Sequence, residues 1–332
     1  MKCRCSIVTI GLRILAGLVA CAGAVVIVAW IIGRIWTDTS TWTQWLWWIP
    51  TPATSAAALL SAVAVRLGFA KTKRRTILCG VFACGLLFGA VWFSFVDHRL
   101  FASVDPHTTS RASLRIVHWN ISSPLRGEED DFVAGFDALE GDVFLLTSPS
   151  GTARLSKRVR EEGWFEQRLN IFSIVTRKPI IGSRVLVSDA SIRIVLIEVD
   201  TIEQLGRTLI VYAVDLPSEL DRPRMEVARQ VHEMLVYADG PPADVIVGDC
   251  NIPRGSASLE VAFPGYLHAY DIAGHGYGAT FRRDLPLYHI DHIFVLQQGD
   301  LIVERYDILR PTLGRHLIQA ATIRRSAEEP TP

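Results

Sequence analysis

The chain has 332 residues, with 34 basic and 34 acidic side chains and a net charge of zero. This total hides two unlike parts: residues 1–97 carry nine Lys or Arg and two acidic residues, and residues 98–332 carry 25 basic and 32 acidic residues. A charge near −7 (25 − 32) in the second part argues against a general affinity for polyanions, which needs Lys and Arg to neutralise phosphates. Cys250 is the only cysteine of this part, so no disulfide can form within it.

Three apolar stretches, at about residues 14–35, 46–65 and 77–96, are long enough to cross a bilayer as helices. They predict a three-helix transmembrane segment over residues 1–97. A cleaved signal peptide ending before Cys21 is disfavoured, because the apolar run continues after that cysteine. A buried soluble core is also disfavoured, since the stretches have no amphipathic period.

The basic residues predict the orientation of this segment. Lys2 and Arg4 precede the first stretch, and four of residues 71–75 are Lys or Arg, whereas the loop at 37–44 has an acid, no cation and flanking tryptophans. Lys and Arg favour the cytoplasmic side. We therefore expect a multi-pass cell (inner) membrane protein with a cytoplasmic N-terminus and an extracytoplasmic C-terminal domain. The lipid bilayer is the expected partner, and no protein partner is predictable.

The remainder divides into a linker (98–112), a domain (113–325) and a polar tail (326–332). Apolar segments bounded by turn residues predict strands at 114–119, 143–146, 171–176, 192–199, 208–214, 245–248, 290–295, 302–307 and 317–323. Helices are expected at 130–139, 158–163, 222–238 and 256–262. Many strands with a few interposed helices predict an α+β domain of two packed sheets with helices outside.

Six segments, in order, resemble the endonuclease/exonuclease/phosphatase superfamily. They are Leu114–Asn120, Asp142–Leu146, Ile174–Ile180, Val247–Asn251, Ile290–Phe294 and Gly314–His316. The resemblance implies a DNase I-like, four-layer αββα sandwich. It also implies hydrolysis of a phosphodiester or phosphomonoester by water, usually with Mg²⁺. Such chemistry needs a base for the water, donors for the phosphoryl oxygens and a cation for the developing charge.

The resemblance also assigns roles to individual residues. Asp249 would orient the attacking water, and Asn251 would help to hold the water or the phosphate. Asn120 would lie beside the metal or phosphate. His316 would contact the phosphoryl group, and Asp291 would fix the orientation of His316.

The sequence departs from the family pattern at the expected metal ligands. Thr147 and Ser148 stand where the family has Gln-Glu, and Arg315 stands where it has the aspartate of Ser-Asp-His. Asp215 replaces a functional histidine at the end of another strand. Mg²⁺ prefers carboxylate oxygens and water, so a serine and a guanidinium cannot form that site. If a metal is bound, Asn120 and Asp249 are its remaining candidate ligands.

Three functional interpretations remain open. In the first, the domain is a divergent phosphoesterase in which Arg315 binds phosphate in place of a metal. In the second, Asp215 or another acid relocates the metal. In the third, the domain is a weak or inactive relative that serves as an extracytoplasmic binding or scaffold module. The substrate is open among nucleic acid, phospholipid and small phosphoesters. The negative charge of the domain and its tether favour lipid-derived or small phosphoesters.

Simpler interpretations compete at single motifs. Asp249 and Asn251 are also typical of a turn after a strand. His289, Asp291 and His292 resemble a metal cluster, but alternation along a strand would place His292 on the opposite face, so a zinc site is not expected there. Ser148 lacks the glycine pattern of a nucleophile elbow, which argues against a serine hydrolase.

Overall fold

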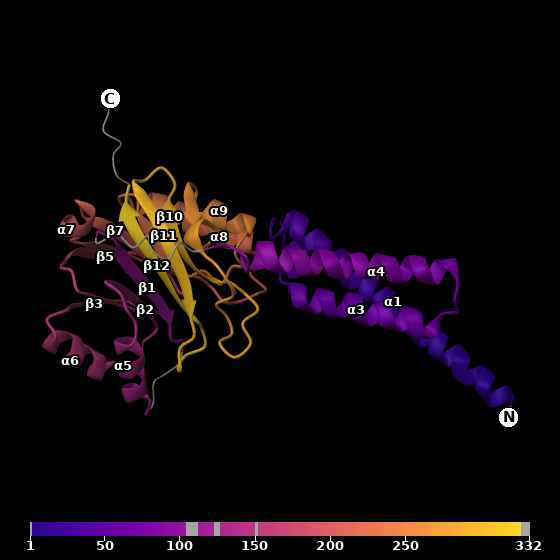
Figure 1. The fold of residues 1–332 in the computed structure, drawn as a ribbon. Coiled ribbons are helices and arrows are strands. Elements are labelled where there is room, and N and C mark those ends of the chain that lie inside the picture. The colour runs from indigo at the N-terminus through magenta and orange to yellow at the C-terminus, as the bar shows by residue number, and fades with distance from the viewer. Residues whose placement is uncertain (1, 104–111, 123–126, 150–151, 327–332) are drawn as a thin grey trace. The chain divides into compact units, whose positions relative to one another are not determined.

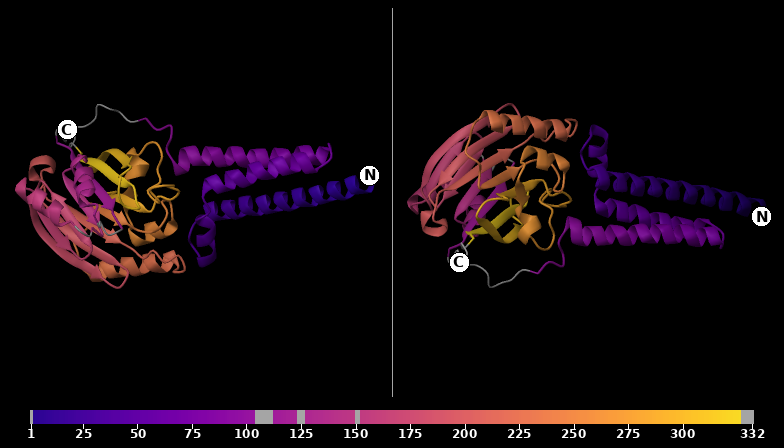
Figure 2. Two further views of the ribbon diagram at one scale, coloured as in Figure 1. Left: turned by 90° about the horizontal axis from the view of Figure 1, so that it is seen from below. Right: turned by 90° about the horizontal axis from the view of Figure 1, so that it is seen from above.

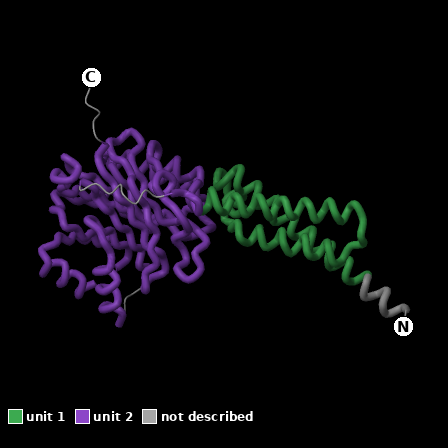
Figure 3. The backbone as a smooth tube through the Cα atoms, in the orientation of Figure 1, with its two compact units in different colours: residues 1–98 green, residues 99–332 purple. Residues whose placement is uncertain are grey.

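The structure is a computed structural model that describes residues 2–103, 112–122, 127–149 and 152–326. The chain forms two compact units, residues 1–98 and 99–332 (Figure 3). Most of the predicted linker and nearly all of the predicted tail fall outside the described residues.

The N-terminal unit is built from long helices. Its main helices are α1 (Lys2–Trp36), α3 (Thr51–Gly68) and α4 (Lys73–Trp92), and α4 continues into a π-helical turn, η1 (Phe93–Asp97). Residues Ile10–Trp36 and Lys73–Asp97 are each long and apolar enough to cross a membrane. Small residues let the helices approach: a Cβ added at Gly23 of α1 would lie 1.9 Å from Ser61 Oγ of α3.

The second expected span, residues 46–65, is not one continuous helix. A short helix, α2 (Thr41–Trp47), ends before Pro50, and α3 begins at Thr51 at an angle of 72° to α2. Pro50 has an extended backbone at the N-cap of α3, and a proline lies in the first turn of that helix, where its missing N–H is tolerated. The described residues of this unit therefore contain two candidate spans, or three if the bent pair crosses as one.

The second unit contains two six-stranded sheets that lie face to face (Figures 1 and 2). The first sheet has the order β11 (Leu301–Leu309), β12 (Ile318–Arg325), β1 (Leu114–Asn120), β2 (Val143–Thr147), β4 (Phe172–Thr176) and β3 (Phe165–Leu169). The second has the order β5 (Ile180–Ser188), β6 (Arg193–Val199), β7 (Leu209–Asp215), β8 (Val245–Asp249), β10 (Asp291–Leu296) and β9 (Tyr266–His268).

Helices cover the outer face of each sheet. Phe132 and Phe136 of α5 (Glu129–Asp137), with apolar residues of α6 (Ala153–Glu161), pack against the first sheet. Residues of α8 (Arg224–Tyr237) and α9 (Ala257–Ala262) pack against the second sheet. A third apolar core lies between the sheets. The central strands are therefore buried on both faces, which explains their nearly continuous apolar runs.

All nine strands expected from the sequence are present, and each observed end lies within two residues of the expected one. The sequence did not indicate β3, β5 or β9, or the short helices α7 (Ile202–Leu205) and α10 (Ala269–Ala273). The helix expected at 158–163 begins earlier, at Ala153, and ends at Glu161. β3 and β5 lie at sheet edges and are partly exposed, so their sequences lack the apolar runs of the central strands.

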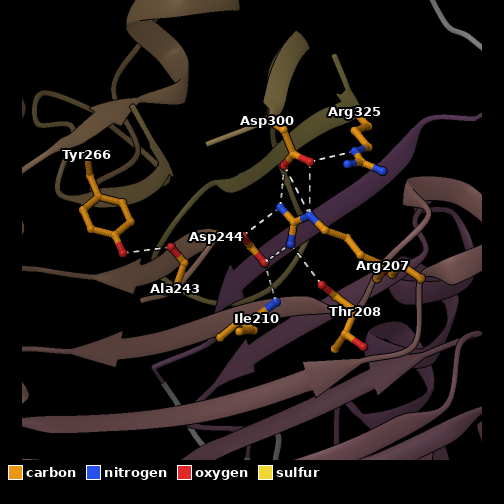
Figure 4. A network of polar contacts seen from close by, with 9 residues as sticks. Arg207, Thr208, Ile210, Ala243, Asp244, Tyr266, Asp300 and Arg325 are labelled. Atoms are coloured by element: carbon orange, nitrogen blue, oxygen red, sulfur yellow. Dashed lines mark hydrogen bonds and ion pairs between the residues drawn. The ribbon is translucent and has the colours of Figure 1, made fainter. Parts of the chain in front are cut away.

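A charged cluster joins the two sheets at one end of the sandwich (Figure 4). Arg207, just before β7, binds both carboxylate oxygens of Asp244 at 2.7 and 2.8 Å and reaches Asp300, just before β11, at 2.7 Å. Asp300 also accepts a hydrogen bond from Arg325 of β12 at 2.7 Å. Because β7 and β8 begin here, their carboxyl ends lie at the opposite end of the sandwich.

Candidate active site

Three aspartates lie side by side at this opposite end of the second sheet. Asp215 ends β7, Asp249 ends β8 and Asp291 begins β10, and the register places Asp249 directly opposite both of the others. Val247, two residues before Asp249, belongs to the core between the sheets. Since side chains alternate along a strand, the three aspartates face the first sheet. Arg193 of β6 lies opposite Asp215 and extends the row.

The first sheet contributes an asparagine to the same site. Asn120 ends β1, is 4% exposed and donates a hydrogen bond from Nδ2 to Asp249 Oδ2 at 2.8 Å. This bond joins the two sheets. The other amide atom, Asn120 Oδ1, is buried and has no hydrogen-bond partner among the described residues.

His316, just before β12, completes the cluster. Its Nδ1 donates to Asp291 Oδ2 at 2.9 Å, and its Nε2 lies 3.8 Å from Asp249 Oδ2. Asp291 is fully buried, and its backbone N–H donates to Thr280 Oγ1 at 3.2 Å. The structure thus links Asp291, His316, Asp249 and Asn120 in one continuous chain of polar contacts.

Asn251 holds the loop that follows β8. Its backbone N–H donates to Asp249 Oδ1 at 2.9 Å, and its Nδ2 donates to the carbonyl oxygen of Leu216 at 2.9 Å. Its backbone is left-handed, with φ 50°. The turn that the sequence allowed after this strand is therefore present, and it fixes the Asp249 carboxylate within the cluster.

The charges of the cluster depend on one another. Burial opposes the charge of His316, but the charge and hydrogen bond of Asp291 raise the pKa of His316 to about 9. Burial would raise the pKa of Asp291, yet His316 holds it below its ordinary value. Burial and then the charge of Asp291 raise the pKa of Asp249. At neutral pH, Asp291 and His316 thus form an ion pair beside a carboxyl group that exchanges protons near this pH.

Asp215 and Arg193 form a second ion pair beside this cluster. Arg193 Nη1 lies 3.0 Å from Asp215 Oδ2, and both side chains remain partly exposed. Burial raises the pKa of Asp215 to about 6, against the opposing effect of Arg193. The sequence indicated Asp215 but not Arg193 as a residue of the site. The antiparallel pairing of the two predicted strands, 192–199 and 208–214, was the signal that could have found it.

The residues at the positions where the resemblance expects metal ligands differ in their exposure to solvent. Ser148 and Arg315 are exposed, and the guanidinium of Arg315 makes no hydrogen bond or ion pair with the described residues. Thr147, in contrast, is buried and pairs with Asn120 across the first sheet. Its hydroxyl lies 3.0 Å from His118 Nε2.

His118 is the centre of a neutral hydrogen-bond chain behind Thr147. Gln319 Nε2 donates to His118 Nδ1 at 2.9 Å, so the ring proton is on Nε2 and points to Thr147. Burial lowers the pKa of His118 to about 4, which keeps the ring neutral. A neutral hydroxyl backed by a neutral imidazole therefore occupies the inward position at the end of β2.

The site offers few free ligands for a magnesium ion. Asp249, Asp291 and His316 each offer an atom within 4.8 Å of the others. However, His316 Nδ1 already contacts both carboxylate oxygens of Asp291. Asp249 and Asn120 Oδ1 remain, and a single carboxylate is the lower limit of the one or two with which proteins usually bind Mg²⁺.

A separate group of three buried histidines lies near the start of β10. They are His268, His289 and His292. The alternation argument was wrong here, because His289 precedes the strand and lies with His292. Tyr270 N–H donates to His268 Nδ1, so His268 Nε2 donates to His292 Nδ1 at 2.8 Å and His292 Nε2 donates to the carbonyl oxygen of Ile252. These tautomers place a proton on His268 Nε2, which opposes metal binding at that atom.

Comparison with known proteins identifies the fold. No protein-family model and no curated protein matches the sequence. An endonuclease/exonuclease/phosphatase family protein from Bacteroides thetaiotaomicron matches with 16% identity and a TM-score of 0.51, over 65% of this chain and 99% of its own. A protein of the same description from Beutenbergia cavernae matches with 17% identity and a TM-score of 0.49, over 65% and 72%. A humanized TDP2 of D. rerio matches with 15% identity and a TM-score of 0.49, over 64% and 99%.

At these identities the likeness defines the fold alone. Residues 99–332 have the endonuclease/exonuclease/phosphatase, DNase I-like fold, as the resemblance predicted. The activity of the chain has to be argued from its own site.

Proposed function

We propose that the C-terminal unit hydrolyses a phosphoester with Asp249 as the base and His316 as the acid. The observation that carries this proposal is the contact chain from Asp291 through His316 and Asp249 to Asn120, which unites both sheets. A raised pKa suits Asp249 to general-base catalysis near neutral pH, and an imidazolium suits His316 to proton donation.

The proposed reaction uses one water molecule. The water oxygen forms a bond to phosphorus while the bond between phosphorus and the leaving oxygen breaks. Asp249 accepts the proton of the water, and His316 Nε2 gives its proton to the leaving oxygen. Asp291 keeps the ring of His316 in position, and Asn120 Nδ2 holds the carboxylate of Asp249.

A purified full-length protein in detergent is the material for the test. We expect the wild type to hydrolyse at least one member of a panel of nucleic-acid, phospholipid and small phosphoesters. Asp249→Ala should lower kcat by about a thousandfold or more, because general-base catalysis and water positioning are both lost. Equal turnover by the two proteins, or none by either, would contradict the proposed hydrolysis.

A binding or scaffold module is the second candidate function. Ser148 and Arg315, at positions where the resemblance expects metal carboxylates, favour it. A panel in which the wild type binds phosphoesters but turns none over would select this candidate over the hydrolase.

We further propose that the C-terminal unit lies outside the cytoplasm, held by the apolar helices. The basic loop 71–75 and the acidic first loop support this orientation. An impermeant maleimide should label Asp189→Cys, an exposed position, in intact spheroplasts, and should label Lys71→Cys only after permeabilisation. The five native cysteines of residues 1–97 are first replaced by serine, and Cys250 is buried and contributes little background. The reverse pattern of labelling would contradict the orientation.

A further inference from the structure

A phosphoryl group at the candidate active site faces an electrostatic problem. Three carboxylates, those of Asp215, Asp249 and Asp291, lie in one row and face it. The cation of His316 is paired with Asp291 through Nδ1, so it offers a bound anion only its Nε2 side. Like charges repel strongly in a buried site, so an anionic substrate needs a further cation here.

Arg193 lies where it can supply this additional positive charge. It extends the row of aspartates, on the same face of the sheet, through its pairing with Asp215. Its guanidinium donates from Nη1 to Asp215 and from Nη2 to the carbonyl oxygen of Ala190 at 3.1 Å. Its other N–H groups make no hydrogen bond with the described residues, and the side chain is 29% exposed. A planar guanidinium with free N–H groups can bind two phosphoryl oxygens at once.

Arg315, the arginine that the resemblance places at a metal position, is a weaker candidate. It is exposed and precedes His316, and its backbone oxygen accepts a hydrogen bond from the Arg283 N–H at 2.7 Å. No described acidic residue holds its side chain toward the site. An arginine that an aspartate of the site already orients loses less side-chain entropy on binding than an unrestrained one.

We propose that Arg193 binds the phosphoryl oxygens of the substrate and supplies the positive charge that the resemblance assigns to magnesium, while Asp215 holds Arg193 in position. The inference rests on the proposed function, because it assigns a role in the same site. Phosphate binding by Arg193 can nevertheless be tested without measuring hydrolysis. It also predicts that binding and turnover do not require a divalent metal.

Two single variants have opposite expected effects. The dissociation constant of inorganic phosphate is measured by calorimetry on the full-length protein in detergent, with EDTA present. Arg193→Gln should weaken phosphate binding about tenfold or more, because a charge-assisted hydrogen-bond pair is lost. Asp215→Asn should strengthen binding, because the asparagine oxygen can still accept the hydrogen bond that positions Arg193, while the repelling negative charge is lost. A purely structural role of this ion pair would make both variants weaken binding.

The controls separate charge from folding. Arg193→Gln combined with Asp215→Asn leaves no unpaired charge, so it should fold as the wild type does and still bind phosphate weakly. Arg184→Gln, on the outer face of β5 opposite Leu196, should leave phosphate binding unchanged. Thermal unfolding of each variant checks its folding.

The outcomes distinguish the inference from the proposed function. Phosphate binding in EDTA that depends on Arg193 supports the inference, whether or not any ester is hydrolysed. Binding that Arg193→Gln leaves intact, binding that appears only with added Mg²⁺ or Mn²⁺, or no phosphate binding by the wild type overturns it. In the first two of these cases, hydrolysis abolished by Asp249→Ala would leave the proposed function standing.

Discussion

Asp291→Asn is expected to lower kcat for phosphoester hydrolysis by about a thousandfold. In the wild type, both oxygens of Asp291 contact Nδ1 of His316 and keep the ring charged. An asparagine can keep the contact but removes the negative charge, so burial then lowers the pKa of His316. A neutral His316 cannot give a proton to the leaving oxygen. The loss of a general acid is worth roughly 10²–10⁴ in rate.

The pH profile of kcat separates this role from a structural one. His316 has a raised pKa of about 9, so the activity that needs its proton should be present below this pH and fall as the pH rises through it. Asp249 has to lose its proton to act as a base, so its raised pKa sets the acidic limb of the profile. In Asp291→Asn the alkaline limb should move to lower pH.

Asp189→Asn is the matched control for Asp291→Asn, since Asp189 is exposed on the loop before β6. It should retain wild-type kcat and the wild-type pH profile. A wild-type alkaline limb in Asp291→Asn, or a normal kcat, would show that His316 does not act as the acid.

Gly248→Ala is expected to destabilise the C-terminal unit by roughly 3 kcal/mol or more. Gly248 lies in β8 beside Asp249, and a Cβ at this position would lie 1.8 Å from the carbonyl oxygen of Val214 in β7. A backbone atom cannot move aside as a flexible side chain can. The two central strands would have to separate locally, with loss of ladder hydrogen bonds.

Denaturant unfolding followed by near-ultraviolet circular dichroism measures the effect. Gly135→Ala is the control, because a Cβ at Gly135 of α5 would meet Trp119 at 3.5 Å, an ordinary contact. Alanine also favours the helix by up to about 1 kcal/mol over glycine. The control should therefore unfold at the wild-type denaturant concentration or above it. Equal midpoints for Gly248→Ala and the wild type would contradict the steric argument.

The central strands could be predicted from the sequence because a strand that is buried on both faces consists of a nearly continuous run of apolar residues. Of the edge strands, β11 was predicted, but β3, β5 and β9 were not. β3 and β5 expose much of one face, and β9 has only three residues, so neither length nor pattern separates them from loops. Hydropathy likewise predicted the region around residues 46–65 but not the bend before Thr51, since a turn at Pro50 does not change the mean apolarity.

The candidate site divides in the same way. Asn120, Asp249 and Asp291 are at strand ends or starts, so a strand prediction and a motif order were sufficient to group them. Arg193 was missed because its place in the site depends on the pairing of β6 with β7, which no local pattern states. Arg315 was given a role from its position in a motif, yet its neighbour His316 has the buried side chain.

The hydrogen bond from Asn120 to Asp249 has a mechanical consequence. Asn120 belongs to one sheet and Asp249 to the other, so the distance between these side chains depends on the relative position of the two sheets. The ion pairs of Arg207 hold the two sheets together at the opposite end of the sandwich. A change in the relative position of the sheets should therefore displace the residues of the candidate active site most. Substitutions that create cavities in the apolar core between the sheets should therefore misalign the reacting groups. They should lower kcat at temperatures below the unfolding transition of the unit.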